Sequence, residues 1–188
     1  TCVAHEQAAA MMADAYSRVG PNLGATMVTS GPGATNLITG IACSWFDSVP
    51  TIHISGQVNQ HELSGHDKNT SKVRQVGFQE TVIVSIVKPI TKFAYQLKNE
   101  NEIKYIFEKA CHIAQSGRPG PVLIDIPMNL QRKKIIASNL KNFKPIKEKV
   151  KQSKLIKKIN LLKKKLKKSK RPVIIIGGGI TISKQRDK

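Results

Sequence analysis

Glu6 is the side chain in this 188-residue sequence that is best suited to acid–base chemistry. It lies near the start of a predicted helix over residues 4–18, beside alanines and methionines, and an apolar setting raises the pKa of a carboxyl group. A carboxyl group with a raised pKa is suited to general acid–base chemistry near neutral pH. Taken alone, Glu6 also fits a structural role, in which an acidic side chain interacts with the positive end of a helix dipole.

A glycine-containing turn is the second candidate for chemistry. Residues 30–36 read SGPGATN and stand between an apolar stretch at 25–28 and a helical pattern at 34–46. Two glycines around a proline make a tight turn that allows close approach, and it would place Asn36 at the carboxyl end of a sheet, where α/β proteins bind ligands. The turn lacks the third glycine and the Gly-Lys-Ser/Thr ending of phosphate-binding loops. Alone, such a turn is more often a packing device than a binding site.

The elements that must position these residues alternate along the chain. Apolar stretches predict strands at 25–29, 51–55, 92–97 and 122–126, and helical spacing predicts helices at 4–18, 34–46, 79–87 and 101–115. This alternation predicts a parallel sheet covered by helices, which is an α/β fold. The side chains expected to form the apolar stripe of the first helix are Ala8, Met11, Met12, Ala15 and Val19. Trp45 and Phe46 are expected in the core.

The stretch 59–76 is polar and has no sustained periodicity, which predicts a surface loop. Long loops near a site are often functional. The loop carries His61, Glu62, His66 and Asp67, whose spacing matches no metal site. We therefore expect no metal ligands in this chain.

The positive charge is confined to the C-terminal part. Residues 1–131 hold ten Lys and Arg against ten Asp and Glu, so the whole formal net charge of +19 belongs to residues 132–188. There the composition predicts a linker, a lysine-rich helix at 151–168 with an apolar stripe, and an apolar strand at 172–176 before three glycines. Exposed lysines can bind nucleic acid, but no aromatic side chains are interleaved with these, which favours a solvated linker helix.

The three cysteines, Cys2, Cys43 and Cys111, are odd in number and lack zinc or redox spacing. They favour a reducing compartment, and we expect a cytoplasmic location. No apolar run approaches the ~20 residues of a membrane span. Since the sequence starts at Thr1 almost on its first motif and ends soon after its last predicted strand, we expect it to be an internal segment of a longer protein.

Five motifs occur in a fixed order along the chain. They are HEQAAA at 5–10, SGPGATN at 30–36, SGQV at 55–58, FQE at 78–80 and SGRPGP at 116–121. This series resembles the pyrimidine-binding domain of thiamine-diphosphate enzymes, most closely the large catalytic subunit of acetolactate synthases (acetohydroxyacid synthases). The resemblance runs from residue 1 to about residue 127 and resumes at 171–179.

The resemblance implies roles for individual residues. Glu6 would hydrogen-bond N1′ of the cofactor's aminopyrimidine and favour the tautomer that activates the thiazolium ring, which accepts the electrons released on decarboxylation. Pro32, Asn36 and Gln57 would line the pyrimidine end of thiamine diphosphate. Each of these three also has a structural interpretation: a rigid turn, a helix cap and a hydrogen bond at a strand end.

Further positions carry weaker implications. Phe78 and Gln79 match residues at the substrate cavity of the family, although Phe78 also fits a place in the core. Lys88 stands where these enzymes usually carry an arginine that contacts FAD, and lysine lacks the planar guanidinium, so FAD binding stays open. His5 would either shuttle protons or cap a helix, and His53 is expected to be structural.

By this resemblance, the fold is a thiamine-diphosphate-binding α/β domain over residues 1–131 that lacks its first strand. A linker would follow at 132–150, and the truncated start of a middle domain at 151–188. The diphosphate and Mg²⁺ would be bound by a third domain whose motif this sequence lacks, so we expect the segment alone to be inactive.

The implied parent is an acetolactate-synthase-type carboligase of branched-chain amino-acid biosynthesis. It would decarboxylate pyruvate, join the hydroxyethyl unit to a second 2-keto acid, and act as a dimer or tetramer with active sites between subunits. Another thiamine-diphosphate-dependent decarboxylase or carboligase is the alternative, because the loop 59–76 is longer than its family counterpart. A non-catalytic module with a nucleic-acid-binding tail is the third hypothesis. We expect neither a nucleic-acid nor a membrane partner.

Overall fold

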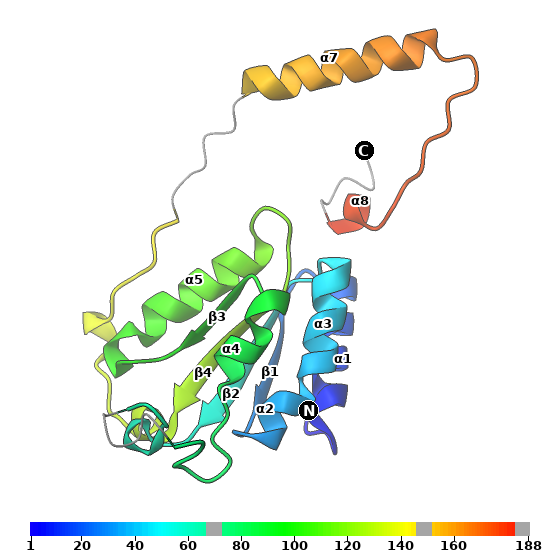
Figure 1. Cartoon of the computed structure of the whole chain (residues 1–188). Helices are drawn as coiled ribbons and strands as arrows, with labels where there is room; N and C mark the ends of the chain where they lie inside the picture. The colour runs from blue at the N-terminus through cyan, green and yellow to red at the C-terminus, as the bar shows by residue number, and fades with distance from the viewer. Residues whose placement is uncertain (67–72, 146–151, 183–188) are drawn as a thin grey trace. The chain divides into compact units, whose positions relative to one another are not determined.

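A computed structural model describes residues 1–66, 73–145 and 152–182 (Figure 1). The chain forms two units, Thr1–Lys144 and Pro145–Lys188. The five motifs all lie in the first unit.

A parallel sheet forms the centre of the first unit. Its strands are β1 (Gly24–Val28), β2 (Thr51–Gln57), β3 (Phe93–Gln96) and β4 (Val122–Pro127). They lie in the order β1-β2-β4-β3, and each neighbouring pair is parallel. All four predicted strands are present with ends shifted by one or two residues, and the predicted α/β fold with a parallel sheet is confirmed.

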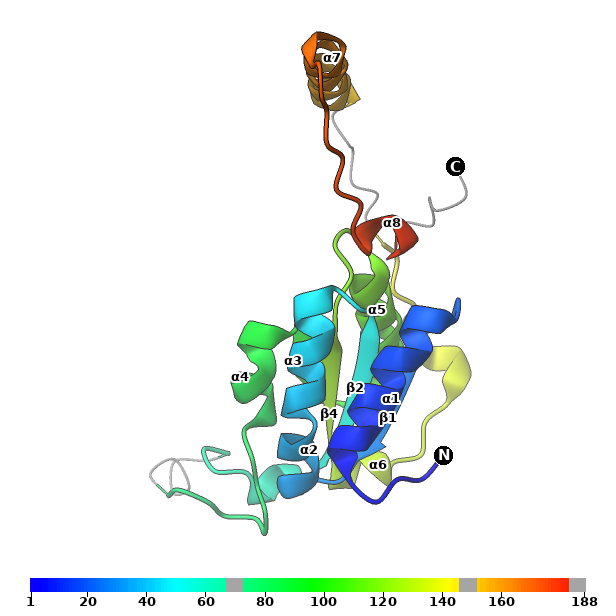
Figure 2. The ribbon, with the colours of Figure 1, turned by 90° about the vertical axis from the view of Figure 1, so that its right-hand side faces the viewer.

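Helices cover both faces of this sheet (Figures 1 and 2). They are α1 (Glu6–Val19), α2 (Pro32–Asn36), α3 (Ile38–Asp47), α4 (Ile83–Val87), α5 (Ile103–Gln115) and α6 (Met128–Gln131). Residues of α1, α2, α3 and α4 pack in one apolar cluster with Leu123. Residues of α5 pack in a second cluster with Val122 and Ile124. Because side chains alternate along a strand, β4 supplies apolar groups to both faces.

Short 3₁₀ segments join these elements, at Gln60–Glu62, Lys88–Ile90, Glu100–Glu102 and Ala137–Asn139. The predicted loop at 59–76 lies partly outside the described residues, as do 146–150 of the predicted linker. The last predicted helix corresponds to α7 (Gln152–Lys168), all of whose residues are exposed, the apolar stripe included.

The predicted strand at 172–176 is wrong. These residues form no strand, and the short helix α8 (Gly179–Ile182) follows them. A strand needs hydrogen bonds from a neighbouring strand, and none of the four described strands pairs with this segment.

The buried face of α1 also differs from the prediction. Instead of the predicted stripe, the residues buried in α1 are Ala10, Ala13 and Asp14. The side chains of Met11 and Met12 are 44% and 47% exposed. The apolar stripe predicted from Ala8, Met11, Met12, Ala15 and Val19 is therefore wrong.

Close approach between backbones explains this difference. A Cβ atom on Gly40 of α3 would lie 2.3 Å from Cβ of Ala10, and one on Gly24 of β1 would lie 2.0 Å from the carbonyl oxygen of Ala13. At such separations only small side chains fit between the elements. The methionines consequently face away from these contacts.

The helix predicted at 34–46 is divided in two and begins earlier. Pro32 occupies the first turn of α2, where its missing N–H has no cost, and α3 begins after Leu37. Trp45 is 37% exposed and Phe46 is 70% exposed, so the prediction that both lie in the core is wrong. The buried face of α3 carries Ile41 and Ser44 instead, because the helical period turns residues 45 and 46 away from the sheet.

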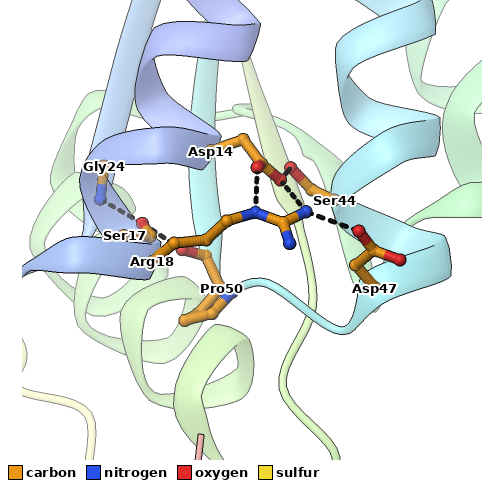
Figure 3. A network of polar contacts seen from close by, with 7 residues as sticks. All are labelled: Asp14, Ser17, Arg18, Gly24, Ser44, Asp47 and Pro50. Carbon is orange, nitrogen blue, oxygen red and sulfur yellow. Dashed lines mark hydrogen bonds and ion pairs between the residues drawn. The ribbon is translucent and has the colours of Figure 1, made fainter. Parts of the chain in front are cut away.

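A polar network holds the C-terminal half of α1 against α3 (Figure 3). The Ser44 hydroxyl donates a hydrogen bond of 2.8 Å to Oδ2 of Asp14, and both side chains are buried. Arg18 pairs with the same carboxylate and reaches Asp47 at 2.7 Å. The direction in which α1 presents its N-terminal end is thereby fixed.

Ser17 ties the same part of α1 to the sheet (Figure 3). Its hydroxyl donates to the carbonyl of Pro50 at 2.6 Å and accepts from the backbone N–H of Gly24 at 2.7 Å. Pro50 immediately precedes β2, and Gly24 is the first residue of β1.

Candidate active site

The carboxyl end of the sheet brings Glu6 and Asn36 into direct contact. The Asn36 amide donates a hydrogen bond of 2.9 Å from Nδ2 to Oε2 of Glu6. Glu6 is the first residue of α1 and Asn36 the last of α2, and both side chains are half-buried. Two residues that sequence analysis assigned to the same ligand, 30 positions apart, are thus neighbours.

The start of α1 is fixed by a capping residue. His5 has an extended backbone, and its Nδ1 accepts a hydrogen bond of 3.1 Å from the backbone N–H of Gln7. This arrangement is a helix N-cap, which satisfies one of the free N–H groups of the first turn. Of the two interpretations of His5, the structure therefore contains the capping one, and Glu6 follows at the positive end of the helix.

The turn at residues 30–36 requires its glycines. Gly31 has φ of +59°, a conformation that favours glycine, and Pro32 follows as the exposed first residue of α2. A Cβ atom on Gly33 would lie 2.7 Å from Cγ2 of Thr29 and 3.5 Å from Oε1 of Glu6. The glycines therefore let the turn pass close to the carboxyl group.

The pKa of Glu6 is lowered from its ordinary value, not raised as predicted. The largest cause is the hydrogen bond from Asn36, followed by a hydrogen bond from the backbone N–H of Glu6 itself, with His5 acting in the same direction and burial opposing them. The prediction failed because the hydrogen bonds that the carboxylate accepts, above all the one from Asn36, outweigh the effect of burial. Glu6 is consequently a carboxylate at neutral pH and a hydrogen-bond acceptor.

Gln57 ends β2 and is buried, with only 3% of its surface exposed. Its Nε2 donates to the carbonyl of Thr81 at 2.8 Å and to Oδ2 of Asp125 at 3.1 Å, while its Oε1 accepts from the backbone N–H of Val58. The hydrogen bond at a strand end, named as its structural interpretation, is present. Contact of Gln57 with a cofactor stays a prediction.

Asp125 is a residue of this region that sequence analysis gave no function. It lies in β4, is fully buried, and accepts hydrogen bonds from Ser55 at 2.6 Å and from Gln96 at 2.8 Å in addition to that from Gln57. Burial raises the pKa of this carboxyl group, and the three donors partly offset the rise. The signal in the sequence is an acidic residue within an otherwise apolar strand, between Ile124 and Ile126.

The FQE segment lies on the glycine turn. A Cβ atom on Gly31 would lie 2.7 Å from both Cβ and the carbonyl oxygen of Gln79, whose φ of +58° is unusual for a residue other than glycine. The helix predicted from residue 79 therefore begins only at Ile83. Phe78 is 84% exposed, so its place in the core, one of two interpretations, is excluded.

Lys88 is exposed and begins the 3₁₀ segment after α4. Because α4 leads from the carboxyl end of the sheet to the start of β3, Lys88 lies away from Glu6 and Asn36. The structure does not bring this FAD-contact candidate to the other candidate residues.

A groove of about 730 Å³ runs between α1 and β1. Glu6, Met12 and Tyr16 line it from the helix, and residues 24–29 line it from the strand side. Within the described part of the chain, β1 pairs only with β2, so its other edge is open along this groove. Glu6 is therefore accessible from the groove.

His53 is buried in β2 and has a structural role. Its ring nitrogens lie 2.8 Å from Oγ1 of Thr26 and 3.0 Å from Oγ1 of Thr51. Burial lowers the pKa of His53 to about 4. Over residues 1–66, 73–145 and 152–182, no group of His, Cys, Asp and Glu could hold a metal ion.

The described helices include none that is both long and apolar enough to span a membrane. Cys2, Cys43 and Cys111 are all unpaired.

Comparison with known proteins finds relatives of this chain. Residues 1–86 match the family described as thiamine pyrophosphate enzyme, N-terminal TPP binding domain. The chain is 41% identical over 188 residues to the acetolactate synthase large subunit of Buchnera aphidicola subsp. Schizaphis graminum, covering 96% of this chain and 30% of that protein. It is 39% identical over 184 residues to the acetolactate synthase large subunit of Haemophilus influenzae, covering 94% and 30%.

A third relative gives the same result. The probable acetolactate synthase large subunit of Methanocaldococcus jannaschii is 41% identical over 187 residues, covering 95% of this chain and 29% of that protein. The chain thus spans about 30% of the length of the curated relatives that it matches. It is a homologue of the acetolactate synthase large subunits and carries, in residues 1–86, the N-terminal TPP-binding domain of the thiamine pyrophosphate enzymes.

Proposed function

We propose that residues 1–131 bind the pyrimidine end of thiamine diphosphate in an enzyme that forms acetolactate from 2-keto acids. The observation that carries this proposal is the hydrogen bond of 2.9 Å between Asn36 and Glu6 at the carboxyl end of the parallel sheet. The names of the relatives support the same activity for the whole protein.

The side chains present fit an aminopyrimidine. Such a ring needs a carboxyl group near a ring nitrogen, and Glu6 offers a half-buried carboxylate beside a groove. When bound, thiamine diphosphate supplies the electron sink for decarboxylation of a 2-keto acid. Glu6 would accept a hydrogen bond or a proton at the ring nitrogen, Asn36 would orient the carboxylate, and the glycines at 31 and 33 would leave room for close approach.

The finer expectations belong to the same proposal. Mg²⁺ and the diphosphate group would be held by parts of the protein outside this chain, and Lys88, which keeps the charge of the family's arginine, would contact FAD if that cofactor is bound. The active enzyme would be a cytoplasmic dimer or tetramer with active sites between subunits, without nucleic-acid or membrane partners. The unpaired cysteines support a reducing compartment.

The test compares the full-length protein with its Glu6→Gln variant. We would measure thiamine diphosphate binding by calorimetry, and pyruvate consumption and acetolactate formation with Mg²⁺ present. Loss of a proton-transfer group costs on the order of 10²-fold or more in rate, so turnover should fall by at least that factor while circular dichroism stays unchanged. Glu100→Gln, the same change at another helix start, is the matched control and should keep full activity.

Two results would change the proposal. Wild-type turnover by Glu6→Gln would remove Glu6 from the chemistry. A wild-type protein that binds thiamine diphosphate and consumes another 2-keto acid without forming acetolactate would favour the alternative decarboxylase or carboligase.

A further inference from the structure

A buried polar cluster lies under the carboxyl end of the sheet. We define the Asp125 cluster as Ser55, Gln57, Gln96 and Asp125, which come from the three strands β2, β3 and β4. The Ser55 hydroxyl donates to Oδ1 of Asp125, and the two glutamine amides donate to Oδ2. The carboxyl group is thus surrounded by donors on both oxygens.

Burying the carboxyl group of this cluster costs more free energy than burying an apolar side chain. A buried carboxylate costs free energy unless it is paired and hydrogen-bonded, and the ion pairs found among the described residues all belong to Arg18. Neutral donors alone therefore satisfy Asp125, and an apolar side chain in its place would leave the buried donors of Ser55, Gln57 and Gln96 without this acceptor. Fully satisfied buried networks fix the geometry of the groups that they contain.

The group whose geometry matters here is the Gln57 amide. Its Oε1 accepts from the backbone N–H of Val58, so its two N–H bonds must go to acceptors. Asp125 takes one of them and the carbonyl of Thr81 takes the other. The carboxylate therefore dictates which end of the amide faces inward, and with it which group is offered to Thr81.

Thr81 connects the cluster to the candidate active site. It ends the segment 77–81, in which Gln79 packs directly against Gly31 of the glycine turn. The same turn leads into α2, which carries Asn36 and so the hydrogen bond to Glu6. A shift of Thr81 would thus move the segment that closes over this turn.

We propose that Asp125 is a positioning residue, which holds the Gln57 amide so that Thr81 keeps segment 77–81 seated on the turn at Gly31. Its importance for turnover rests on the proposed function. The expected effect of Asp125 on segment 77–81 is independent of the proposed function.

The test is amide hydrogen exchange on the cofactor-free, full-length protein, followed by turnover assays. Asp125→Ala should speed exchange at residues 78–82 by about tenfold, the equivalent of one hydrogen bond. A misplaced segment should lower kcat by on the order of 10²-fold, with a smaller change in KM for pyruvate.

Asparagine at the same position should rescue both readouts. In Asp125→Asn, one oxygen can accept from both glutamines while the new amide donates to the Ser55 hydroxyl, so the geometry survives without the charge. Gln96→Ala is the matched control, because Gln96 donates to the same oxygen, whereas among the described residues the Thr81 carbonyl accepts its side-chain hydrogen bond from Gln57. It should lower global stability and leave exchange at 78–82 unchanged.

Three results would overturn the proposal. They are wild-type exchange at 78–82 in Asp125→Ala, an Asp125→Asn variant as impaired as the alanine variant, and a Gln96→Ala variant that loosens the same segment. If Asp125→Ala does not fold, Gln57→Met decides, since it keeps the carboxylate and removes the link to Thr81; unchanged protection would again overturn the proposal. A wild-type protein that fails to bind thiamine diphosphate would refute the proposed function alone, because the exchange readout needs no cofactor.

Discussion

Replacement of Asp14 by alanine should destabilise the first unit by about 2 kcal/mol, mostly through Ser44. Asp14 is only 8% exposed and accepts a hydrogen bond of 2.8 Å from the Ser44 hydroxyl, which is 0% exposed. Without Asp14, that hydroxyl loses its acceptor in a place that water does not reach. A buried polar group left without a partner costs about 1–3 kcal/mol.

The ion pair with Arg18 contributes less. The Arg18 side chain is 44% exposed, and ion pairs at the surface are worth about 0.2–1 kcal/mol. Arg18 also keeps a second partner, Asp47, when Asp14 is removed. The buried hydroxyl, and not the visible ion pair, should therefore dominate the loss of stability.

A double-mutant cycle measures this division. Urea unfolding of Asp14→Ala, Ser44→Ala and the double variant should give a coupling energy of about 1 kcal/mol or more, because removing both partners leaves no orphaned group. Arg18→Met is the control and should cost less than about 1 kcal/mol. Coupling near zero, or a larger loss from Arg18→Met than from Asp14→Ala, would refute this reasoning.

Three further changes have defined outcomes. Gly40→Ala would force its Cβ to within 2.3 Å of Cβ of Ala10, and overpacking should cost about 1–3 kcal/mol in thermal unfolding. Asn36→Leu should raise the pKa of Glu6 toward its ordinary value in a carbon-13 NMR titration, because the main cause of the lowered pKa is removed; an unchanged pKa would contradict the assigned cause. His53 has a pKa of about 4 in the folded chain, against 6.5 ordinarily. Between these two pH values the folded state therefore binds fewer protons than the unfolded state. The free energy of unfolding should therefore rise by about 3 kcal/mol from pH 4 to 6.5, and His53→Gln should flatten that rise.

The fold class could be predicted because parallel strands buried on both faces leave a simple pattern. Each strand is a short apolar stretch followed by a helical period, and all four were found. The order β1-β2-β4-β3 was not predictable in this way, because it depends on where each crossover helix packs. The face of α1 was misjudged because its contacts are set by Gly24 and Gly40, whose small size matters only once the backbones meet.

The candidate site was predictable as a set of residues and not as a geometry. Motif order predicted one ligand for Glu6 and Asn36, and the structure shows that the two side chains are in contact. The hydrogen bond between them, which lowers the pKa of Glu6, could not be predicted because it depends on the orientation of α1. That orientation is set by the network around Asp14 at the other end of the helix. No local sequence pattern predicts this network. The role of Asp125 could not be predicted, because its three hydrogen-bond donors come from strands far from it in the sequence.

The lowered pKa of Glu6 has a consequence for the proposed chemistry. A carboxylate whose pKa is lowered by Asn36 is a weak base, which is a poor match to the proposed role of sharing a proton with a ring nitrogen. A bound aromatic ring would remove water from the carboxylate, and this desolvation would raise the pKa of Glu6 toward that of the ring nitrogen. The hydrogen bond from Asn36 would limit this rise in pKa and keep the carboxylate oriented. Glu6 would thus become an effective proton partner only when the pyrimidine ring covers it, which ties its activation to cofactor binding.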